Sequence, residues 1–241
     1  MTYCVGLLLN EGMVLLSDTR TNAGLDNIST YRKMFFFEEP GERVIVMLTA
    51  GSLSVTQTTI SRLREAIEDP DATEETSIMK APTILKSAAI IGNMLAEVRS
   101  EIDEKLNAMK QGASASMIVA GQRKGGPMRL FLIYPEGNFI QATEDTPFLQ
   151  IGEHKYGKPI LDRVVKPGTS MADAQKAVLL SMDSTLRSNL SVGMPLDLCI
   201  IEKDACAVSG KRRIEAGDEQ FRAMSEAWSK ALRDGFTQIN I

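Results

Sequence analysis

A threonine, an aspartate and a lysine near the start of the chain are the residues best suited to chemistry. Thr2 directly follows Met1, which methionine aminopeptidases remove readily when the next residue is as small as threonine. A free α-amine titrates at about 7.7–8.0, so the amine of Thr2 would accept the proton of its own hydroxyl at neutral pH. One cleavage would therefore place a nucleophile and a general base on a single residue.

Asp18, Lys33 and Gly51 are suited to support that nucleophile. An ammonium group lowers the pKa of a nearby amine by like-charge repulsion, and a carboxylate beside the ammonium holds it in place. Asp18 ends the second predicted strand and Lys33 begins the third, and we expect both strands to lie beside the first. Gly51 lies where a strand runs into a helix, and the free N–H groups there favour a developing oxyanion. These residues predict acyl transfer.

Each of these residues, taken singly, has an ordinary structural interpretation. Asp18 is a common turn residue, and Lys33 suits an edge strand, where lysines prevent aggregation. Cys4 would become an N-terminal nucleophile only after a three-residue cut, for which the sequence holds no processing signal. Only the combination of Thr2 with its partners favours catalysis.

The composition is typical of one soluble globular domain that spans residues 1–241 and carries 44% apolar and 24% charged residues. The net charge of −4 and the short basic cluster at 211–213 argue against a nucleic-acid partner. One histidine, His154, and three unpaired cysteines predict neither a metal site nor a cofactor. The first apolar run is too short to span a membrane and has no basic leader, so we expect a cytoplasmic protein.

Hydrophobic periodicity predicts strands and helices that are grouped in blocks along the chain. We predict strands at 2–9, 13–18, 34–37, 44–48, 115–121, 128–134, 139–143, 196–202 and 205–209. We predict helices at 53–68, 83–111, 154–165, 170–187 and 218–234. The stretch 19–29 is expected to be a loop, Ser170 and Asp173 resemble a capping box, and Gly235 is expected to end the last helix.

The grouping of these elements predicts the fold class. Segregated strands and helices disfavour a doubly wound parallel sheet. The continuous apolar run at 44–48 indicates a strand that is buried on both faces, which requires cover on each side. We therefore expect an α+β protein with helices outside two antiparallel sheets. The first four strands are expected to form an antiparallel meander.

The motifs around these residues resemble those of a known family. Thr2, Lys33 and the segments 16–20 and 49–52 are similar to the active-site motifs of proteasome β-subunits and of the bacterial HslV peptidase. Both groups belong to the N-terminal nucleophile hydrolases, and the segment 17–24 resembles the bacterial ancestral β-subunits, called Anbu. The resemblance covers almost the whole chain in its order of elements and implies a four-layer αββα sandwich.

The resemblance also implies a role for each matched residue. Thr2 would be nucleophile and base, Asp18 and Lys33 its tuning charge pair, and the Gly51 N–H the oxyanion donor. Ser191 matches a serine that supports the threonine amine, whereas the family's nearby aspartate is replaced here by Ser188. A pocket for an apolar or small side chain would be lined by Thr21, Phe35, Thr49 and Leu53.

The expected function is that of a threonine peptidase or amidase subunit that hydrolyses peptides or a small amide through an acyl-enzyme on Thr2. Family relatives imply self-association into a ring or ring-like homo-oligomer. Because the chain has no nucleotide motif, any ATPase partner would be a separate protein. The alternative is a catalytically idle scaffold protein with the same fold, which a retained Met1 would favour because a blocked amine is no base.

Overall fold

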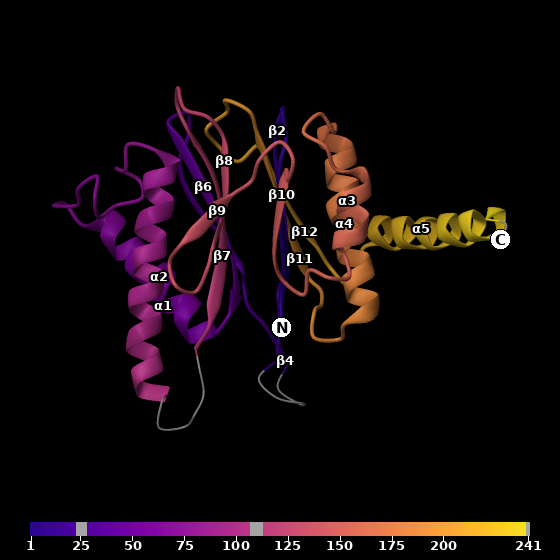
Figure 1. Cartoon of the computed structure of the whole chain (residues 1–241), viewed down its shortest axis with the longest axis horizontal. Coiled ribbons are helices and arrows are strands. Elements are labelled where there is room, and N and C mark those ends of the chain that lie inside the picture. The colour runs from indigo at the N-terminus through magenta and orange to yellow at the C-terminus, as the bar shows by residue number, and fades with distance from the viewer. Residues whose placement is uncertain (23–27, 107–112, 240–241) are drawn as a thin grey trace.

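Two antiparallel sheets lie face to face in the computed structural model, which describes residues 1–22, 28–106 and 113–239. Each sheet is covered on its outer side by a pair of helices, so that four layers follow one another across the molecule (Figure 1). This is the four-layer α+β sandwich expected from the sequence. The N-terminus lies at the lower edge of the sheets, near the middle of the molecule (Figure 1).

The first sheet has the order β10-β1-β2-β11-β12, so the N-terminal strand β1 lies in its interior between β10 and β2. Its strands are β1 (Tyr3–Leu8), β2 (Gly12–Asp18), β10 (Phe148–Gly152), β11 (Leu196–Glu202) and β12 (Gly210–Ile214). The helices α3 (Lys158–Val164) and α4 (Met171–Ser188) pack against its outer face. Alternate residues of β2 serve two cores, since Val14 and Leu16 face these helices while Met13 and Leu15 face the second sheet.

The second sheet has the order β5-β6-β7-β8-β9. Its strands are β5 (Met34–Glu39), β6 (Arg43–Gly51), β7 (Ala115–Arg123), β8 (Arg129–Ile133) and β9 (Phe139–Gln141). The helices α1 (Leu53–Glu68) and α2 (Ile84–Leu106) cover it. The expected burial of β6 on both faces is confirmed, because Arg43 to Ala50 are all buried.

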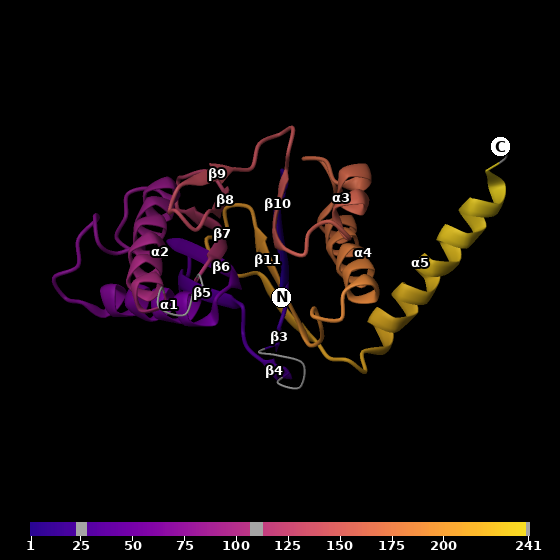
Figure 2. The ribbon, with the colours of Figure 1, turned by 60° about the horizontal axis from the view of Figure 1, so that its bottom comes forward.

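The strands β3 (Arg20–Asn22) and β4 (Ile28–Thr30) and the helix α5 (Glu219–Gln238) lie outside the four layers. The two short strands pair with each other below the sheets (Figure 2). Helix α5 starts beside α4 and then extends away from the body of the molecule (Figures 1 and 2). Residues 230 to 239, at the far end of this helix, are all exposed.

The expected meander of the first four strands is wrong. The β1–β2 and β5–β6 hairpins belong to different sheets, so β5 does not lie beside β1, whose neighbours are β2 and β10. The stretch predicted as a loop at 19–29 includes β3 and β4, which are only three residues long and therefore carry almost no periodic signal. Local pattern determines that a strand exists, but not the sheet that it joins.

Further predicted boundaries also differ. Strand β10 was not predicted, because its pairing with β1 joins segments that are distant in sequence. Strand β12 lies at Gly210–Ile214 rather than at 205–209, because charged residues fill this exposed edge of the sheet. Helix α5 continues past Gly235 to Gln238, at the modest cost of an internal glycine. Helix α3 is shorter than predicted, and the expected end of α2 at 107–111 lies outside the described residues. The Ser170 cap is confirmed, since its side chain accepts the Asp173 N–H.

The phenol of Tyr3 forms a buried link between β1, β10 and α4. Its hydroxyl lies 2.6 Å from Ser181 Oγ and accepts a 2.5 Å bond from Gln150 Nε2. Tyr3 is fully buried, and this burial raises the pKa of its phenol to about 12. The phenol therefore stays neutral in the folded protein at a pH where a free tyrosine has ionised.

This difference predicts a loss of stability in alkali. Between pH 10 and 12 the unfolded chain releases the Tyr3 proton while the folded chain retains it, so the unfolding free energy falls as the pH rises. The stability difference between the wild type and Tyr3→Phe should shrink by about 1.4 kcal/mol for each pH unit in this window. Urea unfolding of both proteins at several pH values measures it, and a difference that does not change with pH would contradict the buried neutral phenol.

Candidate active site

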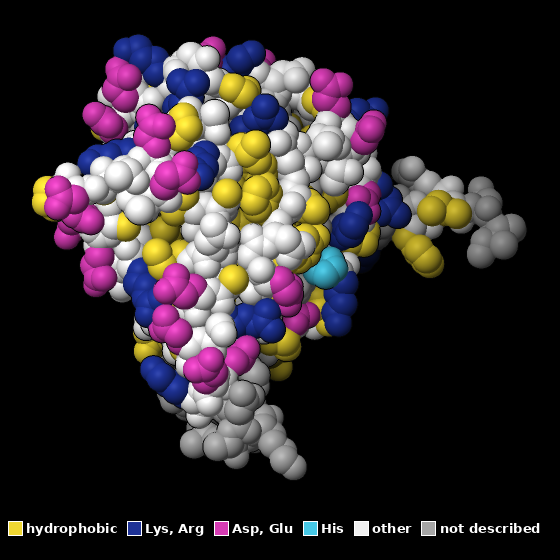
Figure 3. Space-filling view, turned by 60° about the vertical axis from the view of Figure 1, so that its left-hand side comes forward, with side chains coloured by type: hydrophobic (Ala, Val, Ile, Leu, Met, Phe, Trp, Pro, Cys, Tyr) yellow, Lys and Arg dark blue, Asp and Glu magenta, His cyan; other side chains and the backbone are white. Residues whose placement is uncertain are grey.

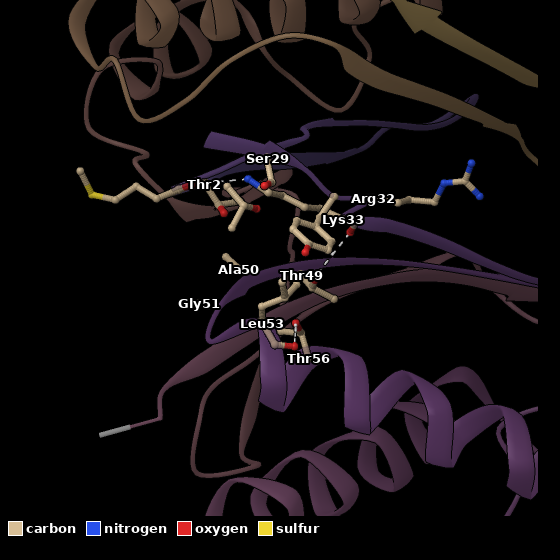
Figure 4. A pocket seen from close by; sticks show the side chains of 12 residues that line it. Thr2, Ser29, Arg32, Lys33, Thr49, Ala50, Gly51, Leu53 and Thr56 are labelled. Carbon is tan, nitrogen blue, oxygen red and sulfur yellow. Dashed lines mark hydrogen bonds between the residues drawn. The ribbon is translucent and has the colours of Figure 1, made fainter. Parts of the chain in front are cut away.

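Thr2 lies at the wall of a pocket between the N-terminal strand and the start of α1 (Figure 4). Its side chain is largely buried, and its carbonyl oxygen accepts a 2.7 Å bond from the Glu153 N–H. The pocket has a volume of about 560 Å³. It is lined by Met1, Thr2, Thr21, Ser29, Tyr31, Arg32, Lys33, Thr49, Ala50, Gly51, Leu53 and Thr56.

Lys33 and Asp18 form a buried ion pair directly behind Thr2. The Lys33 ammonium lies 2.7 Å from Asp18 Oδ1 and 2.6 Å from the Arg20 carbonyl oxygen. It also lies 3.4 Å from the carbonyl oxygen of Met1, which belongs to the same peptide group as the Thr2 nitrogen. The pair thus connects the two sheets, because Asp18 ends β2 and Lys33 immediately precedes β5. The structure brings both predicted residues to Thr2.

Backbone donors hold the Asp18 carboxylate in place. Its Oδ1 accepts the Tyr3 N–H at 3.1 Å, and its Oδ2 accepts the Gly193 N–H at 3.3 Å. Burial raises the pKa of Asp18, while the Lys33 ammonium and the two N–H donors oppose that rise. The carboxylate is therefore oriented on both oxygens, and it holds the Lys33 ammonium near the peptide group that joins Met1 to Thr2.

Cys4 is not placed to act as a nucleophile. Its side chain is fully buried between the sheets, where the thiol lies 3.7 Å from the carbonyl oxygen of Thr49. Burial, together with the nearby Asp18 carboxylate, raises the pKa of this thiol far above its ordinary value. A protonated, inaccessible thiol is chemically inert.

Gly51 lies on the pocket wall opposite Thr2, where β6 ends and α1 is about to begin (Figure 4). Its φ is +108°, a left-handed conformation that glycine adopts readily. A Cβ atom at this position would lie 2.3 Å from the carbonyl oxygen of Ser114. Both constraints require glycine here, and they fix the backbone that faces the pocket.

The residues expected to hold a substrate side chain are divided. Thr21, Thr49 and Leu53 line the pocket, as do Ser29 and Thr56, which the sequence analysis did not identify. Phe35 lies elsewhere and is not among the lining residues. It packs against the core under α1, where the Arg64 guanidinium lies 5.9 Å from its ring centre. Successive side chains of β5 point to opposite faces of the sheet, and Phe35 points toward the helical layer rather than into the pocket.

Ser191 lies in the loop between α4 and β11. Ser191 is half-buried, and its N–H donates to Asn189 Oδ1 at 2.9 Å. Ser188, which replaces the family's aspartate, is exposed at the last position of α4. Neither residue lines the pocket beside Thr2, and the role expected for Ser191 stays a prediction.

Backbone groups are the main part of the site that sequence reasoning missed. The Arg20 carbonyl binds Lys33, the Gly193 N–H binds Asp18, and the Glu153 N–H binds Thr2. Every residue has a backbone carbonyl, and every residue except proline has an N–H, so residue type does not reveal these groups. The structure shows why position 193 is a glycine, since a Cβ atom there would lie 2.2 Å from the Arg20 guanidinium carbon.

The remaining surface offers little competing chemistry. Acidic and basic side chains are interspersed on the face seen in Figure 3, where His154 is exposed. Within residues 1–22, 28–106 and 113–239, no group of three or more His, Cys, Asp or Glu side chains is placed to hold a metal ion. In the same ranges, no helix combines the length and apolar character needed to cross a bilayer.

The chain is similar to several proteins of known structure. Anbu from Hyphomicrobium sp. strain MC1 is 49% identical with a TM-score of 0.91, over 99% of this chain and 98% of that one. Anbu from Yersinia bercovieri is 42% identical with a TM-score of 0.90, over 99% and 98% of the two chains. The Anbu complex from Pseudomonas aeruginosa, described as a helical assembly, is 43% identical with a TM-score of 0.92, over 99% and 97%.

A model of a whole protein family gives the same result independently of the individual structures. The model of the proteasome subunit matches residues 2–201, which include β1, the Asp18–Lys33 pair and all four sandwich layers. The fold, the match to this model and the similar structures agree. This chain belongs to the proteasome subunit family.

Proposed function

We propose that the protein is a threonine-type hydrolase that cleaves amide bonds after removal of Met1. The observation that carries the proposal is the Lys33 ammonium, which binds the Asp18 carboxylate and lies within 3.4 Å of the Met1 carbonyl oxygen. Once Met1 is gone, the free amine of Thr2 would occupy this neighbourhood. The positive charge of Lys33 would then lower the pKa of the amine and keep it available as a base.

The proposed reaction proceeds in two steps. The Thr2 hydroxyl oxygen attacks the substrate carbonyl carbon while its proton moves to the Thr2 amine, and the Gly51 N–H binds the oxyanion. The amine then gives this proton to the leaving amine, the C–N bond breaks, and an ester on Thr2 remains. Water attacks the ester with the Thr2 amine as base, which releases the acid and restores the hydroxyl. Ser191 is proposed to support the amine.

The lining of the pocket favours a small, uncharged substrate side chain. Hydroxyl groups of Thr21, Ser29, Thr49 and Thr56 and the apolar side chain of Leu53 surround it. Lys33 is already paired with Asp18, and the Arg32 side chain points away from Thr2 (Figure 4). We therefore propose peptides or a small amide as substrates.

The cysteines fit a location in the cytoplasm. Cys4, Cys199 and Cys206 are free and buried, as expected under the reducing conditions there.

We also propose that the protein associates with copies of itself through helix α5. Every residue from 230 to 239 is exposed, and Leu232, Phe236 and Ile239 are 55%, 78% and 72% exposed. These residues lie beyond the start of the helix, where Phe221 packs against the core of the body. Short helices are only marginally stable alone in water, so this part would gain stability from a partner. The helical assembly of the Pseudomonas aeruginosa relative supports a second copy as that partner.

The alternative function is that of a scaffold protein that has the same fold but no catalytic activity. While Met1 is attached, the Thr2 nitrogen belongs to an amide and is no base. Met1 itself lines the pocket, so a retained methionine would also occupy space needed by a substrate. In that case α5 would make the protein a self-assembling scaffold.

The first test is the intact mass of the protein expressed in a bacterial cytoplasm, before and after incubation with a peptide epoxyketone. This reagent needs both a threonine hydroxyl and its free amine to form its stable ring. We expect loss of Met1 and one adduct in the wild type, and no adduct in Thr2→Ala. Retention of Met1 would favour the scaffold function, and processed protein without an adduct would contradict catalysis by Thr2.

The second test separates the chemistry of the ion pair from its effect on folding. Lys33→Met alone leaves the Asp18 carboxylate buried and unpaired, which should cost about 3–5 kcal/mol of stability. The double variant Asp18→Asn/Lys33→Met removes both charges and should recover most of that loss. It should still form the epoxyketone adduct at least about 100-fold more slowly than the wild type. Wild-type reactivity in the folded double variant would show that the pair is not needed.

The third test addresses self-association. Leu232→Glu/Phe236→Glu places two carboxylates on the exposed stripe of α5 and should shift the sedimentation velocity distribution toward smaller species. A matched control is Ile140→Glu, which changes a 46% exposed residue on β9 of the second sheet. Far-UV circular dichroism should confirm that both variants fold. An unchanged distribution in the α5 variant would rule out this helix as an assembly contact.

A further inference from the structure

An N-terminal nucleophile has an unusual positional problem. Residues inside a chain are held by covalent bonds on both sides, whereas Thr2 without Met1 would be tethered only through Tyr3. Chain ends are poorly ordered unless other contacts hold them down. Acyl transfer requires a precisely placed Thr2 hydroxyl. That precision must therefore come from the residues that hold the peptide bond between Thr2 and Tyr3, which we call the tether.

The backbone around the tether is held from two sides. The Thr2 carbonyl oxygen accepts the Glu153 N–H at 2.7 Å, and the Tyr3 N–H donates to Asp18 Oδ1 at 3.1 Å. Gly152 makes the first contact possible, since it has a φ of +81° and a Cβ atom there would lie 1.9 Å from the Thr2 carbonyl oxygen. The end of β10 thus closes over the backbone of Thr2.

The Tyr3 side chain connects that same strand end to the helical layer. Its hydroxyl binds Gln150, two residues before Gly152 in β10, and lies 2.6 Å from Ser181 Oγ in α4. Gly157 seals the group, because a Cβ atom there would lie 2.8 Å from the Tyr3 hydroxyl and 2.1 Å from Ser181 Oγ. The hydroxyl therefore has two fixed partners in a tightly packed place.

These contacts form a closed loop of interactions. Tyr3 holds β10 through Gln150, β10 holds the Thr2 carbonyl through Glu153, and Thr2 is bonded to Tyr3. Ser181 fixes the loop to α4, which packs on the outer face of the sheet. A shift of the phenol would pass directly to the strand end that holds the nucleophile.

We propose that Tyr3 is a positioning residue for Thr2, and that its hydroxyl keeps the nucleophile aligned with the pocket. This inference rests on the proposed function of Thr2. Tyr3→Phe retains the ring but leaves the buried Ser181 and the half-buried Gln150 without their partner, so both are expected to move. A misplacement of about 1 Å at a reacting atom costs on the order of 100-fold in rate.

The experiment compares the wild type, Tyr3→Phe and Ser87→Ala, all full-length and processed. Ser87 is a matched control in α2, since it is fully buried and its hydroxyl donates to the Ile78 carbonyl at 3.0 Å on the opposite side of the molecule. Inactivation by the peptide epoxyketone gives a maximal rate and a half-saturating concentration for each protein. We expect about a 10- to 100-fold lower maximal rate in Tyr3→Phe, with a half-saturating concentration within about twofold of the wild type. Ser87→Ala should change neither value.

Hydrogen exchange of the Tyr3 amide provides a readout that does not depend on chemistry. This amide donates to Asp18, so Tyr3→Phe should exchange it faster, whereas Ser87→Ala should leave it protected. An unreactive wild type would refute the proposed function, and the exchange data would still decide whether Tyr3 fixes the tether. Unchanged protection in Tyr3→Phe, or a maximal rate equal to that of Ser87→Ala, would overturn the inference.

Discussion

The ion pair between Lys33 and Asp18 is the interaction on which the candidate site depends. It joins the two sheets at the edge where the N-terminus lies, and both side chains are almost completely buried. A charge that is taken out of water must be compensated at close range. The compensation comes from the carboxylate, the Arg20 carbonyl and the N–H groups of Tyr3 and Gly193. The demands of one buried pair therefore determine the backbone arrangement of three separate segments.

The sandwich architecture gives this pair its surroundings. Three hydrophobic clusters separate the layers, and the middle cluster lies between the sheets with Cys4, Leu15 and Met34 among its members. Protein interiors are close-packed and change shape very little, so the edges of the two sheets keep a constant separation. The pocket beside Thr2 opens at that edge, between β1 and the β6–α1 junction. Rigid packing thus supports a site that is made largely of chain ends, turns and backbone groups.

The predictability of the molecule differed between its parts for physical reasons. The helices α1 and α4 follow from apolar residues at helical spacing, and the doubly buried β6 follows from a continuous apolar run. The strand β10 did not, because five residues with a mixed pattern become a strand only by pairing with β1. The helix α5 was predicted as an element, but its separation from the body was not.

The sequence by itself determined the chemical groups of the site and the class of the fold. Thr2, Asp18, Lys33 and Gly51 stand out by type and spacing, and the block order of elements disfavours a doubly wound parallel sheet. Tertiary structure decided which sheet each hairpin joins and therefore that Lys33 reaches Asp18 from the opposite sheet. It also decided the anchors, such as the Tyr3–Ser181 and Gly193–Asp18 bonds across 178 and 175 positions of sequence. Such contacts depend on burial and hydrogen bonding between remote segments, and neither leaves a local pattern in the chain.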